Sequence, residues 1–174
     1  FVNKFVYKSI IIIFIYLCMK KKITIELFEE GEKANIYSYR VNDEILEFEK
    51  FIDSFMDSDY TNDFDIIDDT VTRILENGAQ ERYFRPEGKM LDYLTAIPEK
   101  GLGCELRVFC LRLNEKIIIL GNGGIKYKNI KKYQDDPILN EIAEEMQKIS
   151  AKLSYSLSNY STTIYEKEFI QIHK

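Results

Sequence analysis

The sequence contains only one histidine and three cysteines in 174 residues. The histidine, His173, is the penultimate residue, and Cys18, Cys104 and Cys110 follow neither a metal-binding spacing nor an even disulfide framework. Catalytic triads and catalytic zinc sites normally depend on well-placed imidazoles. The composition therefore nearly excludes a histidine-dependent nucleophile and a zinc site, and we expect no metal ion and no other cofactor. Cys104 and Cys110 are expected to be buried, inert thiols.

Proline and glycine are also scarce, with three and eight residues, and the sequence has no long linker. Apart from an isoleucine run near its start it contains no repeat and no low-complexity tract. A chain of this length with 45% hydrophobic residues can bury a substantial core. We therefore expect residues 19–174 to form a single globular domain.

Residues 1–18 are interpreted separately from this domain. Their apolar run, residues 9–18, is shorter than the roughly 20 residues of a membrane span. Lys4 and Lys8 precede the run, as in a signal sequence, but small residues typical of a cleavage site are missing. Because Met19 resembles a start, we favour an upstream or signal-like segment, and no membrane association is expected unless this segment is retained.

The net charge of −5 is distributed unevenly along the sequence. Residues 23–79 contain 16 acidic and four basic side chains, whereas residues 80–133 contain 11 basic and six acidic ones. Such asymmetry suggests an anionic partner for the basic part. The alternative is a chance excess of charge on two solvated surfaces.

The pattern of apolar residues predicts an α+β fold. Strands are expected over residues 21–28, 35–41, 82–84, 106–113, 116–120 and 162–172. Amphipathic helices are expected over residues 44–56 and 64–75, and from the Asp136–Pro137 pair to about residue 153. The strand over residues 116–120 is almost purely isoleucine, which is typical of a strand buried on both faces.

The two central strands are joined at Asn114–Glu115 and lead into glycines and then lysines. The glycine segment, residues 121–124, lacks the spacing of a P-loop and is interpreted as a tight turn with positive φ, rather than as a phosphate cradle. The lysines that follow are Lys126, Lys128, Lys131 and Lys132. Such clusters usually bind phosphates or acidic partners, although a solvated loop is the alternative.

The segments ELRVFCL and IIILGNGGIKYK, with the short connection between them, resemble the RelE/HigB toxins of bacterial toxin–antitoxin systems, particularly the phage-derived HigB-like branch. The resemblance covers about residues 65–153. It implies a twisted antiparallel sheet packed against N-terminal helices, here followed by a C-terminal helix. It also implies a cytoplasmic endoribonuclease that cleaves mRNA, commonly on the ribosome, and that a cognate antitoxin inhibits.

The resemblance also implies roles for individual residues. Arg107 matches the family's strand arginine, a phosphate stabiliser, although an outward-facing arginine of an antiparallel sheet is the alternative. Lys126 and Lys128 match the basic residues after the last strand, and Tyr127 is expected to stack on a base or assist proton transfer. Contacts with the RNA backbone are expected from Arg82, Arg85, Lys89, Lys131 and Lys132. Cleavage of this type needs no metal, because the 2′-hydroxyl is the nucleophile.

Three features depart from the family pattern, namely the acidic net charge, the length of the chain and the two leading strands. They affect the expected activity more than the expected fold. The alternative function is that of a noncatalytic binding protein, whose basic hairpin edge docks an acidic partner or nucleic acid. Charge alone does not separate the two functions.

Overall fold

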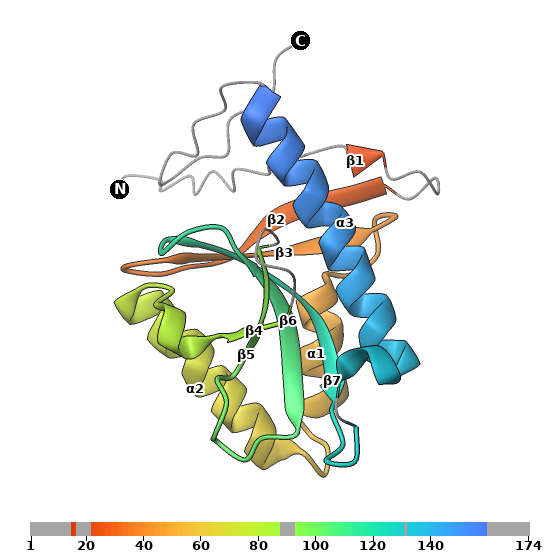
Figure 1. Cartoon of the computed structure of the whole chain (residues 1–174). Coiled ribbons are helices and arrows are strands. Elements are labelled where there is room, and N and C mark those ends of the chain that lie inside the picture. Colours follow the sequence, from red (N-terminus) through yellow and green to blue (C-terminus); the bar gives the residue numbers. More distant parts are fainter. Residues whose placement is uncertain (1–14, 17–21, 88–92, 131, 160–174) are drawn as a thin grey trace, which may run out of the picture.

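A seven-stranded sheet in the order β1-β2-β3-β7-β6-β5-β4 forms the centre of the molecule (Figure 1). The computed structural model describes residues 15–16, 22–87, 93–130 and 132–159. The strands are β1 (Ile15–Tyr16), β2 (Lys22–Glu30), β3 (Asn35–Val41), β4 (Arg85–Pro86), β5 (Leu94–Ile97), β6 (Leu106–Arg112) and β7 (Ile117–Ile125). All neighbouring strands are antiparallel except β3 and β7. The expected α+β class is confirmed.

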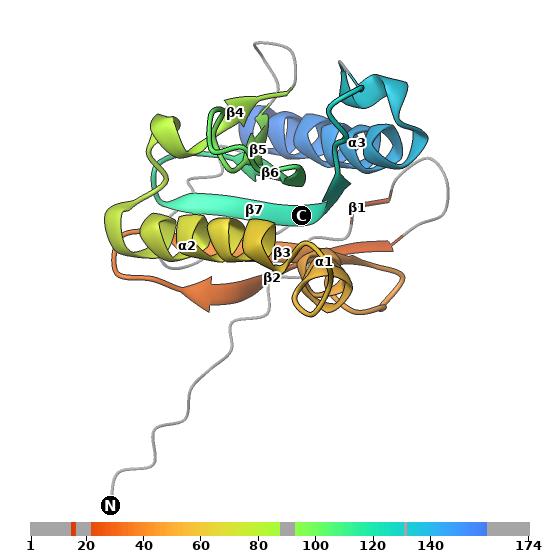
Figure 2. The same cartoon turned by 90° about the horizontal axis from the view of Figure 1, so that it is seen from below.

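Three α-helices cover the two faces of this sheet. They are α1 (Glu47–Phe55), α2 (Thr61–Asn77) and α3 (Pro137–Asn159). Figure 2 shows α1 and α2 on one side of β7 and α3 on the other. The three helices expected from the sequence are thus confirmed, with their ends shifted by a few residues. Of the helices in the described part, none is both long and apolar enough to cross a membrane.

Strand β7 is buried on both faces, as its isoleucines predicted. Ile118 belongs to the core under α1 and α2, whereas Ile119 belongs to the core under α3. The first core contains Phe51, Ile67, Ile74, Val108 and Leu120 among its buried members. The second contains Tyr39, Phe109, Ala143, Met146 and Ile149. Alternate side chains along one strand therefore hold the two helical layers to opposite faces.

Helix α3 begins at the Asp136–Pro137 pair, as expected. The Asp136 Oδ1 atom accepts the backbone N–H groups of Ile138 and Leu139, at 2.9 and 3.0 Å. Proline follows at the first helical position, where its missing N–H would have no partner within the helix. The cap thus fixes the residue at which the chain, having left β7, enters α3 and returns across the sheet.

The strand predicted over residues 82–84 is wrong, because this segment forms the 3-10 helix η1 (Glu81–Tyr83). The N–H of Tyr83 bonds to the carbonyl of Gln80 at 3.0 Å, and that of Phe84 to Glu81 at 3.1 Å. These local bonds tighten the backbone, and strand pairing begins only at β4, where Arg85 pairs with Ala96. The strand predicted over residues 162–172 lies outside the described residues.

The turn predicted at residues 121–124 is also wrong, because β7 continues through the glycines to Ile125. None of these glycines has a positive φ. A Cβ atom on Gly123 would collide with the carbonyl oxygen of Arg107, and one on Gly121 would lie 2.5 Å from Met146 Sδ. The glycines therefore allow β7 to pass close to β6 and α3 rather than to reverse direction.

Candidate functional site

The candidate site lies at the end of the sheet where β6 begins and β7 finishes. Arg107 of β6 is paired in register with Gly124 of β7. A Cβ atom on Gly124 would lie 3.2 Å from Leu139 of α3, so this position faces the α3 side of the sheet. Directly paired residues project to the same face, and Arg107 therefore also points to the α3 side.

The Arg107 side chain forms an ion pair with Glu87, which follows β4. The Nη1 atom of Arg107 lies 2.9 Å from Glu87 Oε1, and the two side chains are only 14% and 12% exposed. Burial raises the pKa of Glu87, although the positive charges of Arg107 and Arg85 oppose this shift. The buried Arg107 Nε has no hydrogen-bond acceptor among the described residues.

Arg85 stands behind this pair and anchors the backbone. Its Nε donates to the carbonyl of Pro98 at 2.6 Å, and its Nη2 donates to the carbonyl of Glu99 at 3.0 Å. Burial lowers the pKa of Arg85, while the Glu87 carboxylate opposes the shift. Arg85, expected to bind RNA backbone, is thus a buried fixed charge whose donors bond to loop carbonyls.

Lys126 completes the group from the exit of β7. Its backbone N–H bonds to the carbonyl of Glu105 at 2.8 Å, and its Nζ donates to the carbonyl of Ile130. Burial and the charge of Arg107 lower the pKa of Lys126, and Glu87 opposes them. We call Arg85, Glu87, Arg107 and Lys126 the cationic cluster; it holds three positive groups about one carboxylate.

Tyr127 and Lys128 make contacts different from those of the cationic cluster. The side chain of Tyr127 lies beside that of Tyr60, a residue of the α1–α2 connection. Partial burial raises the pKa of Tyr60, and the neighbouring Tyr127 and Glu105 add to this shift. The Lys128 Nζ lies 3.5 Å from Glu105 Oε1, and the lysine side chain is 85% exposed.

The remaining residues expected to bind RNA are dispersed. Arg82 of η1 is exposed, lies 5.1 Å from the ring centroid of its neighbour Tyr83 and donates to that hydroxyl. Lys132 is exposed and precedes the short helix η2 (Tyr133–Asp135). Lys89 and Lys131 lie outside the described residues. Of the expected site residues, the structure thus brings Arg107 and Lys126 together, with Arg85 behind them.

Sequence reasoning did not find Glu87, Tyr60 or Asp63. A signal for Glu87 existed, since Arg85 and Glu87 have the spacing that places two side chains on one face of extended chain. Asp63 Oδ2 accepts the N–H groups of Glu105 and Leu106 at 2.6 and 3.1 Å, and so fixes the start of β6. Nothing in the sequence connects Tyr60 or Asp63 with a segment more than 40 positions away.

Cys110 is buried, as expected, whereas Cys104 is only partly buried. Burial is the main cause that raises the pKa of both Cys104 and Cys110 to about 12. Both are therefore protonated thiols near neutral pH, not nucleophilic thiolates. Among the residues that the structure describes, no group of three His, Cys, Asp or Glu side chains could hold a metal ion.

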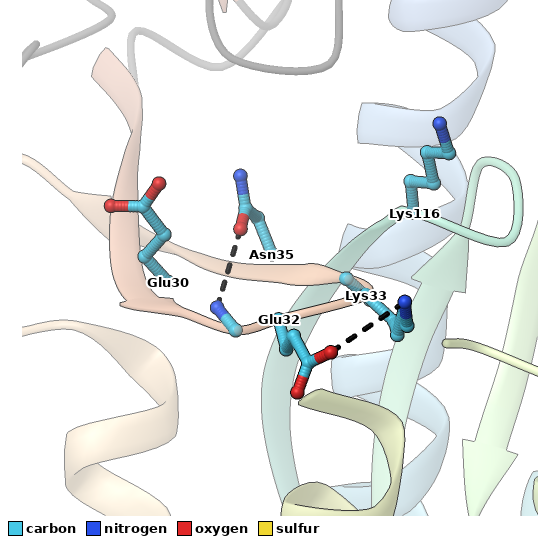
Figure 3. Close-up of a pocket in the computed structure, with 7 residues that line it drawn as sticks. Glu30, Glu32, Lys33, Asn35 and Lys116 are labelled. Atoms are coloured by element: carbon cyan, nitrogen blue, oxygen red, sulfur yellow. Dashed lines mark hydrogen bonds and ion pairs between the residues drawn. The ribbon is translucent and has the colours of Figure 1, made fainter. Parts of the chain in front are cut away.

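A pocket of about 290 Å³ lies far from the cationic cluster, beside the β2–β3 turn (Figure 3). It is lined by Glu30, Gly31, Glu32, Lys33, Ala34, Asn35 and Lys116. Lys33 and Glu32 are 3.6 Å apart, and Asn35 Oδ1 accepts the N–H of Gly31 at 3.3 Å. The pocket is near the start of β7, whereas the cationic cluster is at the end of that strand.

Comparisons of the chain with protein-family models, with curated proteins and with solved structures gave no significant match. The chemistry of the cationic cluster is therefore the main guide to function. Its arginine and lysine suit a phosphate, and its carboxylate suits proton transfer. These are the types of side chain that metal-independent phosphodiester cleavage requires.

Proposed function

We propose that the chain is a metal-independent endoribonuclease of the RelE/HigB type, with the cationic cluster as its active site. The observation that carries the proposal is the buried Arg107–Glu87 pair, with Lys126 beside it. The order of elements supports it, because α1 and α2 precede the antiparallel strands β5, β6 and β7. The proposed substrate is mRNA, free or on the ribosome, in the cytoplasm, and a cognate antitoxin is the proposed inhibitor.

In the proposed reaction Glu87 accepts the proton of the ribose 2′-hydroxyl. The 2′-oxygen then bonds to phosphorus, and the bond from phosphorus to the 5′-oxygen breaks. A general base works best when its pKa lies close to the working pH, so the raised pKa of buried Glu87 suits this role. The products are a 2′,3′-cyclic phosphate and a 5′-hydroxyl end.

Arg107 and Lys126 supply the positive charge that this reaction needs. The guanidinium of Arg107 stabilises the phosphorane through its positive charge. Lys126 donates a proton to the departing 5′-oxygen, and its lowered pKa makes it a better acid than an ordinary lysine. The incoming phosphate competes with Glu87 for Arg107, which frees the carboxylate to take the proton.

Inducible expression of the full chain, with measurement of growth and mapping of RNA ends, tests the proposal. Wild type should arrest growth and generate new 5′-hydroxyl ends, and R107Q and K126A should strongly reduce both effects. Arg40 is the matched control, because it forms a similar pair with Glu26, at 2.7 Å, on β2 and β3. R40Q should keep the activity. A wild-type chain that is expressed and folded but generates no new ends would favour the noncatalytic binding protein instead.

A further inference from the structure

An aromatic ring and a carboxylate lie at the same end of the sheet as the cationic cluster, in addition to the groups assigned to cleavage. The ring is that of Tyr127, which is 48% exposed. Its contact with Tyr60 joins the β7 exit to the α1–α2 connection, and Tyr60 in turn packs edge-on against Phe55 at a centroid distance of 6.5 Å. The exposed ring is thus held in place by residues far away in the sequence.

The carboxylate is that of Glu105, whose backbone is fixed at both its N–H and its C=O. The N–H donates to Asp63 Oδ2 at 2.6 Å, and the carbonyl accepts the N–H of Lys126 at 2.8 Å. The Glu105 side chain is 27% exposed, and its contact with the exposed Lys128 is a long one of 3.5 Å. A weak, solvent-exposed ion pair of this kind is easily exchanged for a ligand.

We propose that Tyr127 and Glu105 form a subsite for a guanine base of single-stranded RNA, beside the phosphate held by the cationic cluster. The inference rests on the proposed function, because it names the base that the same site selects. Tyr127 provides the stacking surface, which is how proteins commonly hold unpaired bases. Glu105 provides the selectivity.

The selectivity follows from the pattern of donors on the bases. Guanine presents two adjacent donors, N1–H and N2–H, which match the two oxygens of a carboxylate. Adenine and cytosine present one amino donor beside a ring nitrogen that accepts, and uracil presents one donor between two acceptors. A carboxylate therefore attracts guanine through two hydrogen bonds and repels the acceptor of each other base.

The subsite lies at the same end of the sheet as the cationic cluster. Lys126 and Tyr127 are adjacent in sequence, and Glu105 lies two residues before Arg107 at the start of β6. The hydrogen bond between Lys126 N–H and the Glu105 carbonyl joins the two strand ends directly. A nucleotide whose base is held by Tyr127 and Glu105 thus places its own phosphate or the next one near Arg107.

The test measures binding without cleavage, by fluorescence anisotropy of the full chain with labelled five-nucleotide RNAs. The probes are uridine oligomers with a central guanosine, inosine or adenosine, and 2′-O-methylation at every ribose prevents cutting. Guanosine should bind about tenfold more tightly than adenosine, with inosine between them because it lacks the N2 amino group. E105Q should lose this preference, because an amide offers one acceptor and one donor.

Two further variants identify the source of any effect. Y127L should weaken binding to all three RNAs by a similar factor, because stacking does not distinguish the bases. Glu115 is exposed in the β6–β7 connection, at the far end of β7, and E115Q is the matched control that should bind like wild type. Melting curves of all variants report whether the fold is retained.

Equal affinity for guanosine and adenosine, no binding of any probe, or an unchanged guanosine preference in E105Q would each overturn the inference. Because the probes are not cut, the result does not depend on catalysis. Guanosine-selective binding by a chain that generates no RNA ends would support the subsite and reject the nuclease. Cleavage without guanosine preference would support the nuclease and reject the subsite.

Discussion

Arg107 and Glu87 are 20 residues apart in sequence, yet their side chains form a 2.9 Å ion pair at the end of the sheet. Neither strand β4 nor strand β6 alone brings the two charges together. Pairing of β4 with β5, and of β5 with β6, is what places them side by side. Because the pair is largely desolvated, removal of one partner leaves a buried charge without compensation. Substitutions here should therefore be chosen to preserve hydrogen bonding.

The first prediction concerns the proton acceptor. E87Q should lower the rate of RNA cleavage by roughly 10²- to 10⁴-fold, the usual contribution of a positioned general base. The fold should be retained, because the amide oxygen can still accept from Arg107. Single-turnover cleavage of a defined RNA, with melting curves, measures both quantities. E26Q alters the matched pair on β2 and β3 and should leave the rate unchanged; an E87Q rate equal to wild type would reject Glu87 as the base.

The second prediction concerns pH. Glu87 must be ionised to accept a proton, so activity should rise with pH through the raised pKa of this buried carboxyl. Lys126 must be protonated to act as the acid, so activity should fall again at alkaline pH, through a pKa lowered by burial and by Arg107. A bell-shaped rate profile should result. K126A should reduce the rate and remove the alkaline limb, and a wild-type profile that is flat over both limbs would contradict the assignment.

The third prediction concerns the glycines of β7. G123A should destabilise the fold by about 1–3 kcal/mol or more, because its Cβ would overlap the backbone of Arg107 and Val108, which cannot move aside. G124A is the matched control, since its Cβ would meet only the flexible end of the Leu139 side chain, at 3.2 Å. Urea unfolding should rank G123A well below G124A in free energy of unfolding. Equal values would mean that β7 does not approach β6 as described.

The fourth prediction concerns Asp63, which holds the start of β6. D63A removes the acceptor of two backbone N–H groups and should destabilise the fold by about 1–3 kcal/mol. D65A removes the same charge from an exposed position of α2 and should have little effect. Thermal unfolding of both variants at neutral pH provides the comparison. Similar melting temperatures for the two would show that the Asp63 bonds contribute little.

Local patterns predicted most of the secondary structure, because the apolar spacing of a helix or strand depends only on residues close together in sequence. The alternation of residues 35–41 and the apolar spacing of α1 and α2 correspond to elements that the structure contains. The glycine segment was wrongly predicted to be a turn, because a glycine needed for close strand packing and one needed for positive φ look identical in sequence. Only the collision with the Arg107 carbonyl distinguishes them.

The candidate site was predicted in part. Arg107 and Lys126 stand out in sequence, since both interrupt or follow apolar strands. Glu87 does not stand out, because its role depends on its burial and on its ion pair with Arg107, and both arise only in the folded chain. Arg85 shows the opposite error: its charge is visible in the sequence, but its hydrogen bonds to Pro98 and Glu99 depend on the fold of a distant loop.

The parallel pairing of β3 with β7 joins residues 35–38 to residues 117–120. Contacts between such distant segments close a long loop and form slowly relative to local structure. During synthesis, β3 consequently has an unoccupied edge until residues 117–120 have been made. Lys126 of the cationic cluster follows the last residue of β7, so an N-terminal fragment that ends before Lys126 lacks part of the cluster. A nascent chain is thus without the site until its central strand has been synthesised.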